Sequence, residues 1–167
     1  MMLDLNAPIV PGASAAGFHI GQFMEPNGPM AAMFVSEPIL NPYVPSSDGV
    51  HYRYRSDSVD LWVMNNVITQ IGVHGAYHGK LLDHITLGMT IDDIERRIGP
   101  CMQDNQDNLA IAGIGGLCFD VVWRPNHPAK ELDLRVPELR FTPITWFFIC
   151  QSQAFVRYPL RTLYQAT

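Results

Sequence analysis

The chain has 167 residues, of which 16% are charged, and its formal net charge at pH 7 is −5. This length allows one hydrophobic core and is typical of a single domain, which we place at residues 1–167. The negative charge argues against nucleic acid as a partner, because phosphate binding needs a cationic surface.

No apolar run reaches the roughly 18 residues that a membrane-spanning helix needs. Residues 1–6 carry neither the basic region nor the apolar segment of a secretory signal. Cys101, Cys118 and Cys150 form no Cys-x-x-Cys pair, and we interpret them as reduced thiols, as is usual in the cytosol. We therefore expect a cytoplasmic protein that binds no membrane.

The first 50 residues contain seven prolines, which favours an irregular extended chain over long helices. Such a segment either wraps a sheet or stays partly disordered. Within it, residues 17–21 (Gly-Phe-His-Ile-Gly) begin like residues 83–88 (Asp-His-Ile-Thr-Leu-Gly). Alternating apolar segments follow both stretches, which suggests one supersecondary unit used twice, over residues 17–73 and 83–123.

Alternation of apolar and polar residues predicts two strands within residues 51–64. Asn65-Asn66 is then a plausible hairpin turn, because asparagine tolerates positive φ better than most residues. Residues 67–73 supply the returning strand. We expect half-buried antiparallel strands here.

The next clear element is a short helix over Ile91–Ile98. Thr90 is a good N-cap, and Asp92 and Asp93 would lie in the first turn, where carboxylates favour the helix dipole. Isoleucines at positions 91, 94 and 98 form one apolar stripe, and Gly99-Pro100 ends the helix. A helix this short is marginal alone, so it must pack on a sheet.

After the helix we predict a polar loop at 104–108, a strand at 109–112, a glycine-rich turn at 113–116 and a strand at 117–122. The predicted fold class is α+β, an antiparallel sheet packed by short helices, with the helix-plus-hairpin unit as a tandem repeat.

Residues 124–167 are predicted to form an irregular C-terminal extension, because prolines punctuate them. Within it, residues 144–149 are densely apolar and aromatic. They are either a buried strand or a sheet edge that a partner covers, and a free edge would leave a homodimer open.

Three histidines are the strongest indication of chemistry. His74 and His78 are four residues apart and His84 follows six later, whereas a zinc site needs three or four converging ligands. Glycines at positions 72, 75 and 79 predict a loop, in which spacing does not ensure convergence. We therefore expect no metal, no other cofactor and no catalytic residue.

The exposed face of the sheet is the candidate site. If Val59, Leu61 and Val63 face the helix, the residues between them face outward and form an aromatic binding surface. The alternative is that the proline-rich N-terminal segment covers Trp62. Acidic residues of the 104–108 loop would steer a basic partner. The predicted partner-binding residues are Asp60, Trp62, Met64, Tyr77, His78, Asp104, Asp107 and Trp123.

The run Ile85-x-Leu87-Gly88-Met89-Thr90-x-x-x-Ile94-x-x-x-Ile98-Gly99-Pro100, with Gly115-Gly116-Leu117-x-Phe119 after a polar loop, resembles the helix-hairpin unit of BamE-like and beta-lactamase-inhibitor-like folds. The resemblance covers residues 60–122. Similar units occur in small cytoplasmic proteins that look like immunity proteins of bacterial polymorphic or type VI secreted toxins. BamE proteins carry a signal and a lipid-bearing cysteine, which this sequence does not display, so the inhibitor-like relatives fit better.

The resemblance implies tandem helix-plus-sheet units with a concave face for another protein. We therefore predict a cytosolic immunity or inhibitor protein that binds and neutralises a toxic effector without doing chemistry. One alternative is a small metal-dependent hydrolase that uses His74, His78 and His84. Another is a structural or chaperone-like module of a secretion or envelope assembly.

Overall fold

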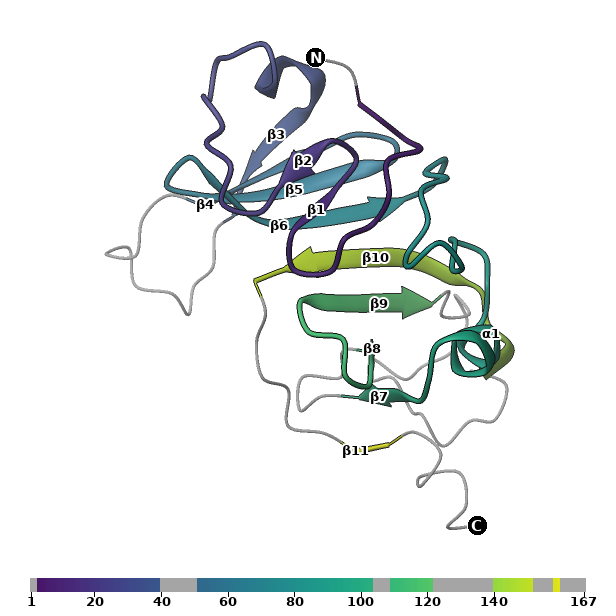
Figure 1. Ribbon diagram of the computed structural model, residues 1–167. Coiled ribbons are helices and arrows are strands. Elements are labelled where there is room, and N and C mark those ends of the chain that lie inside the picture. Colours follow the sequence, from purple (N-terminus) through teal and green to yellow (C-terminus); the bar gives the residue numbers. More distant parts are fainter. Residues whose placement is uncertain (1–2, 40–50, 104–108, 122–139, 152–157, 160–167) are drawn as a thin grey trace, which may run out of the picture.

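One antiparallel sheet dominates the protein (Figure 1). The structure is a computed structural model that describes residues 3–39, 51–103, 109–121, 140–151 and 158–159. Within these ranges nine strands pair in the order β11-β7-β8-β9-β10-β6-β5-β4-β3. Their bounds are β3 Val35–Pro38, β4 His51–Arg55, β5 Val59–Met64, β6 Val67–His74, β7 Cys101–Gln103, β8 Leu109–Ile111, β9 Leu117–Val121, β10 Ile144–Cys150 and β11 Tyr158–Pro159.

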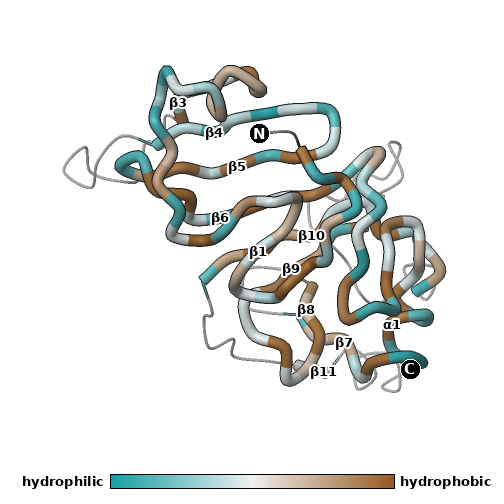
Figure 2. Tube along the Cα trace, turned by 45° about the horizontal axis from the view of Figure 1, so that its top comes forward, coloured by the Kyte–Doolittle hydropathy of each residue, from teal (hydrophilic) through white to brown (hydrophobic). Residues whose placement is uncertain are grey.

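The predicted β5–β6 hairpin is confirmed. Asn65 and Asn66 have φ of 51° and 63°, so both take the positive φ that a two-residue hairpin turn requires. Met64 pairs with Val67 directly beside the turn. Figure 2 shows hydrophobic and hydrophilic residues alternating along β5, as expected for a strand with two different faces.

The predicted helix is confirmed as α1 Ile91–Arg97, one residue shorter than expected. The Thr90 hydroxyl accepts a hydrogen bond from the Asp93 N–H, and the Asp93 carboxylate accepts one from the Thr90 N–H. This reciprocal capping box satisfies two backbone donors that the helix would otherwise leave unpaired. Ile91 and Ile94 are fully buried in the core that α1 shares with the sheet.

A buried carboxylate ties α1 to the chain that leads into β10. The Glu95 side chain is 1% exposed, accepts a hydrogen bond from the Cys101 N–H and pairs with Arg140 at 2.5 Å. Arg140 also reaches Asp92 at 3.3 Å. The helix therefore holds β7 on one side and the start of β10 on the other.

The N-terminal segment wraps one face of the sheet. β1 Ser14–Ala15 and β2 Phe18–His19 form a small hairpin that packs over β6 (Figure 1). Phe18 and Met24 are buried in the core that includes the inward residues of β5 and β6. Of the two predicted possibilities, wrapping is therefore correct for residues 3–34, whereas residues 35–38 join the sheet as its edge strand β3 and residues 40–50 lie outside the described ranges.

Residues 144–149 form a central strand and not an edge. β10 pairs with β6 on one side and with β9 on the other. The edge interpretation is therefore wrong, because both sides of the strand already carry ladder hydrogen bonds, and a homodimer cannot form through it. β7 was not predicted, since three residues are too few to show an alternating pattern.

The sheet-rich, antiparallel character is confirmed, whereas the tandem repeat is not. Within residues 17–39 and 51–73, the described part of the first unit, the helical content is one turn of 3-10 helix, η1 Ala31–Met33. Apart from Gln151 and β11, residues 151–167 are outside the described ranges, as are residues 122–139. In the described part of the chain, α1 is too short to cross a membrane.

The capping box gives a pH-dependent prediction. Hydrogen bonds from the Thr90 N–H and hydroxyl lower the pKa of Asp93, so its stabilising effect is present above the ordinary aspartate pKa and is lost as pH falls through the lowered value. Asp93→Asn should reduce the free energy of unfolding by about 1 kcal/mol at pH 7. In urea titrations this difference from the native chain should vanish at strongly acidic pH, where Asp93 is itself neutral.

Asp83→Asn is the matched control, because it removes the same charge from an exposed loop position. It should leave the free energy of unfolding within about 0.5 kcal/mol at both pH values. A difference for Asp93→Asn that persists unchanged at acidic pH would contradict the role given to the ionised carboxylate.

Candidate functional site

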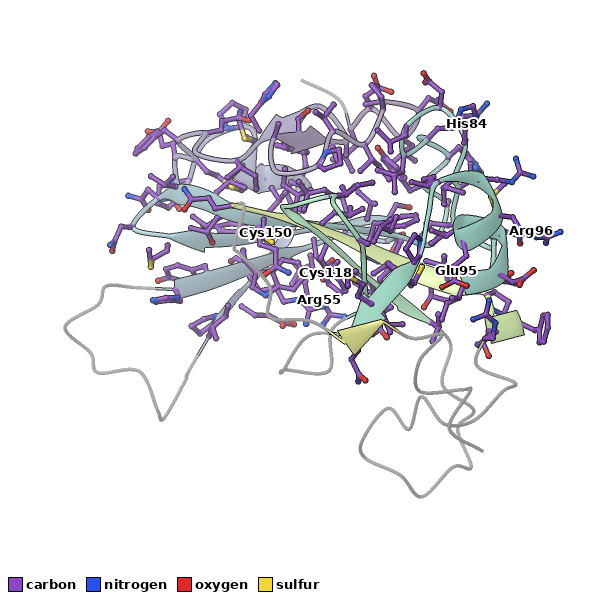
Figure 3. All side chains as sticks on the ribbon, turned by 60° about the horizontal axis from the view of Figure 1, so that its bottom comes forward. Arg55, His84, Glu95, Arg96, Cys118 and Cys150 are labelled. Carbon is purple, nitrogen blue, oxygen red and sulfur yellow. The ribbon has the colours of Figure 1, made fainter. Side chains whose placement is uncertain are left out.

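A row of half-buried aromatic side chains lies on the sheet face that the N-terminal segment leaves uncovered. Figure 3 shows this segment on one side of the sheet and Arg55 on the other. Register and alternation place five residues on the side of Arg55, and we call them the aromatic face. They are Arg53 on β4, Trp62 on β5, His74 on β6, and Trp146 and Phe148 on β10.

The rings of the aromatic face are packed against one another. Trp146 stacks on the His74 ring at a centroid distance of 3.7 Å and on Phe148 at 5.4 Å. Phe148 meets the Trp62 ring edge-on at 5.9 Å. These contacts run across β5, β6 and β10, so the rings form one connected layer.

Gly72 makes room for this layer. It lies between Trp62 and Trp146, and a Cβ atom there would be 2.9 Å from Cζ3 of Trp62 and 3.1 Å from Cζ3 of Trp146. Both distances are shorter than ordinary van der Waals contact. The absence of a side chain at this one position lets the two tryptophan rings close over the strand.

A buried ion network lies beside the rings. The Asp60 carboxylate is 1% exposed and binds the Arg53 guanidinium, with the Nη2–Oδ2 distance at 2.5 Å and the Nε–Oδ2 distance at 2.8 Å. Nε2 of His74 lies 3.2 Å from Oδ1 of Asp60. The Arg53 guanidinium is also 5.1 Å from the centroid of the Trp62 ring, a cation–π distance. Asp60 therefore orients two members of the aromatic face.

The predicted exposure of Asp60 and Tyr77 is wrong. Asp60 does lie on the expected face, but Arg53 and His74 cover it. Tyr77 is 2% exposed, its hydroxyl donates to the Ala7 carbonyl and accepts from the Ala16 N–H, and burial raises its pKa. Tyr77 thus anchors the N-terminal segment instead of facing a partner.

The other predicted site residues divide into two groups. Trp62 is half-buried, Met64 is 36% exposed and His78 is exposed. Trp62 is partly covered by its neighbours Arg53, Gly72 and Phe148, whereas the β1–β2 hairpin of the N-terminal segment packs on the opposite face. Asp104, Asp107 and Trp123 lie outside the described residues.

A cleft of about 440 Å³ opens next to the aromatic face. Its lining includes His74, Tyr77, His78, Thr145 and Trp146. His84 does not belong to it, and the described residues hold no group of three or more His, Cys, Asp or Glu side chains that could bind a metal ion. The three histidines of the hydrolase alternative therefore do not converge.

Two ring-bearing members of the face were missed as site residues. Trp146 and Phe148 alternate with buried Phe147 and Ile149, and this period of two is present in the sequence. Both faces of β10 carry apolar residues, so the sequence did not show which of them faces outward.

The Asp120 carboxyl lies next to this face. Asp120 pairs with Trp146 across β9–β10, and burial raises the pKa of its carboxyl while a hydrogen bond from the Val121 N–H lowers it.

The ion network can be tested by unfolding. Arg53→Met removes the main partner of a buried carboxylate and should lower the free energy of unfolding by about 3 kcal/mol, measured by urea titration. Adding Asp60→Leu to this variant should recover part of the loss, because the uncompensated charge is then gone.

Arg55→Met is the control on the same strand. Arg55 is 50% exposed, pairs with exposed Glu37 and lies 4.0 Å from Asp60. Its substitution should lower the free energy of unfolding by less than about 1 kcal/mol. Equal losses for Arg53→Met and Arg55→Met would show that Asp60 does not depend on Arg53.

Comparison with known proteins adds no family to these observations. Neither protein-family models, nor curated proteins, nor solved structures gave a match to the chain. The resemblance of residues 60–122 to the helix-hairpin unit therefore stays a prediction. What can be said of function starts from the aromatic face, its ion network and the adjoining cleft.

Proposed function

We propose that this protein is a binding protein that holds another protein against its aromatic face without catalysing a reaction on that partner. The observation that carries the proposal is the connected layer of Trp62, Phe148 and Trp146 on a face outside the main core. Tryptophan and arginine are the residues most enriched in binding hot spots, and the layer presents both.

Rigidity also supports binding. Ring stacking, the packing over Gly72 and the Asp60 network hold the side chains of the face in one arrangement before any partner arrives. A surface that is already ordered loses little side-chain entropy on association, so more of the contact free energy remains as affinity. Met64, at the end of β5, adds an adaptable apolar group beside the rings.

For the partner we propose a toxic effector protein, which would make this chain an immunity or inhibitor protein of the cytosol. This narrower statement rests on the resemblance of residues 60–122 to the helix-hairpin unit, and the presence of α1 within these residues is compatible with it. A binding role without that partner, in a secretion or envelope assembly, is the structural alternative. The catalytic alternative lacks the convergence of histidines on which it depended.

The experiment is a binding measurement with the protein encoded next to this gene. Trp62→Ala should weaken the affinity by about 30-fold, which corresponds to the roughly 2 kcal/mol of a hot-spot residue. Calorimetry measures the affinity, and thermal unfolding of the free variant checks that the sheet stays folded at the temperature used.

Val10→Ala is the control. Val10 is 43% exposed and belongs to the loop that leads into the β1–β2 hairpin on the opposite face, so the variant loses an exposed apolar side chain away from the aromatic face. The affinity of this variant for the partner should change by less than threefold. Equal weakening by both variants, or no complex at micromolar concentration, would overturn the proposal.

A further inference from the structure

Two cysteines lie on neighbouring strands, Cys118 on β9 and Cys150 on β10. Cys118 pairs with Phe148 and Leu117 with Ile149, and the Cys150 N–H donates to the Gly116 carbonyl at 3.1 Å. Cys150 is therefore opposite Gly116 and diagonal to Cys118, with both side chains on the same face as Phe148. Figure 3 shows the two residues close together on this part of the sheet.

The local packing brings the two thiols into contact. Gly116, which lies opposite Cys150 just before β9, carries no side chain, and the Gly12 backbone fills the space where its Cβ would lie. A hydrogen bond from the Cys118 thiol lowers the pKa of Cys150 from 9.0 to about 7, although burial acts in the opposite direction. Since the thiolate is the reactive form, this contact makes Cys150 a nucleophile near neutral pH.

Exposure assigns different roles to the two sulfur atoms. Cys118 is 8% exposed, whereas Cys150 is half-buried and open to solution. The third cysteine provides a contrast, since Cys101 is 0% exposed and both burial and the neighbouring Glu95 carboxylate raise its pKa. A reagent in solution therefore meets Cys150 first, and Cys101 stays inert.

We propose that Cys118 and Cys150 form a thiol–disulfide exchange site for low-molecular-weight disulfides, with glutathione disulfide as the representative. The Cys150 thiolate attacks one sulfur of the reagent, forms a mixed disulfide and expels one glutathione thiolate. Cys118 then loses its proton and attacks Sγ of Cys150, which expels the second glutathione. The two protein thiols are oxidised to one disulfide, and the reagent is reduced to two glutathione molecules.

The diagonal geometry makes this disulfide easily reversible. Diagonal residues on paired strands have Cα atoms roughly 7–8 Å apart, whereas disulfides usually span about 4.4–6.8 Å. The bridge must therefore draw β9 and β10 together locally. A strained disulfide has a higher reduction potential, so excess reduced glutathione should restore both thiols. The exchange chemistry at this site does not require the binding function proposed above.

Alkylation with iodoacetamide tests the pair without any binding partner. In the native chain at pH 7, mass spectrometry of digested samples should show Cys150 modified far faster than Cys101, with a rate that rises around pH 7. Cys118→Ala removes the hydrogen-bond donor and should slow Cys150 alkylation at pH 7 by roughly five- to tenfold. Cys118→Ser keeps a donor and should leave the rate within about twofold.

Exposure to glutathione disulfide tests the second step. The native chain should pass through a mixed disulfide at Cys150 and end as a protein that has lost two hydrogens, with Cys118 and Cys150 joined. Cys118→Ser should stop at the mixed disulfide. Alkylation of Cys150 no faster than that of Cys101, or a mixed disulfide that persists in the native chain, would overturn the proposal.

Discussion

The architecture depends on β10, because this strand pairs with a neighbour on each side and contributes side chains to both faces of the sheet. Its pairing with β6 joins the β3–β6 half of the sheet to the β7–β9 half. Phe147 and Ile149 point into the core under the N-terminal segment, and Trp146 and Phe148 point the other way. One strand thus fixes both the hydrophobic core and the aromatic face.

Without its ion network, the aromatic face would lose stability, because it buries the charged Asp60 carboxylate. A carboxylate as buried as that of Asp60 has lost most of its hydration, and only paired, hydrogen-bonded charges offset such a loss. Arg53 and His74 provide these contacts and are themselves placed against Trp62 and Trp146. The charges are therefore part of the same rigid layer as the rings, which is why we assign Asp60 a positioning role.

Local signals in the sequence predicted the elements whose causes are local. Thr90 and Asp93 lie within one turn of each other, and Asn65-Asn66 defines its own hairpin, so both were found without knowledge of the fold. The alternation in β5 likewise identified the outward side of Trp62. Such patterns specify which way a side chain points, but not what lies next to it.

Neighbours from distant parts of the chain decided the rest. The burial of Asp60 depends on Arg53 and His74 on two other strands, and that of Tyr77 depends on bonds to the backbone of residues 7 and 16. Cys118 and Cys150 are 32 residues apart in the sequence, and their contact depends on the register between β9 and β10. No periodicity carries such information.

The aromatic face and the thiol pair share the β9–β10 ladder, yet they rest on different physical causes. Binding depends on ring area and on preorganisation, whereas exchange depends on one hydrogen bond between sulfur atoms and on the register of β9 and β10 that places them diagonally. Phe148 separates them on β10, with Trp146 on one side and Cys150 on the other. Because Cys118 pairs with Phe148, a bridge to Cys150 would pull the backbone beside this ring, which contacts both Trp62 and Trp146. Phe148 therefore belongs to both surroundings, and through it a change at the thiol pair can reach the aromatic face.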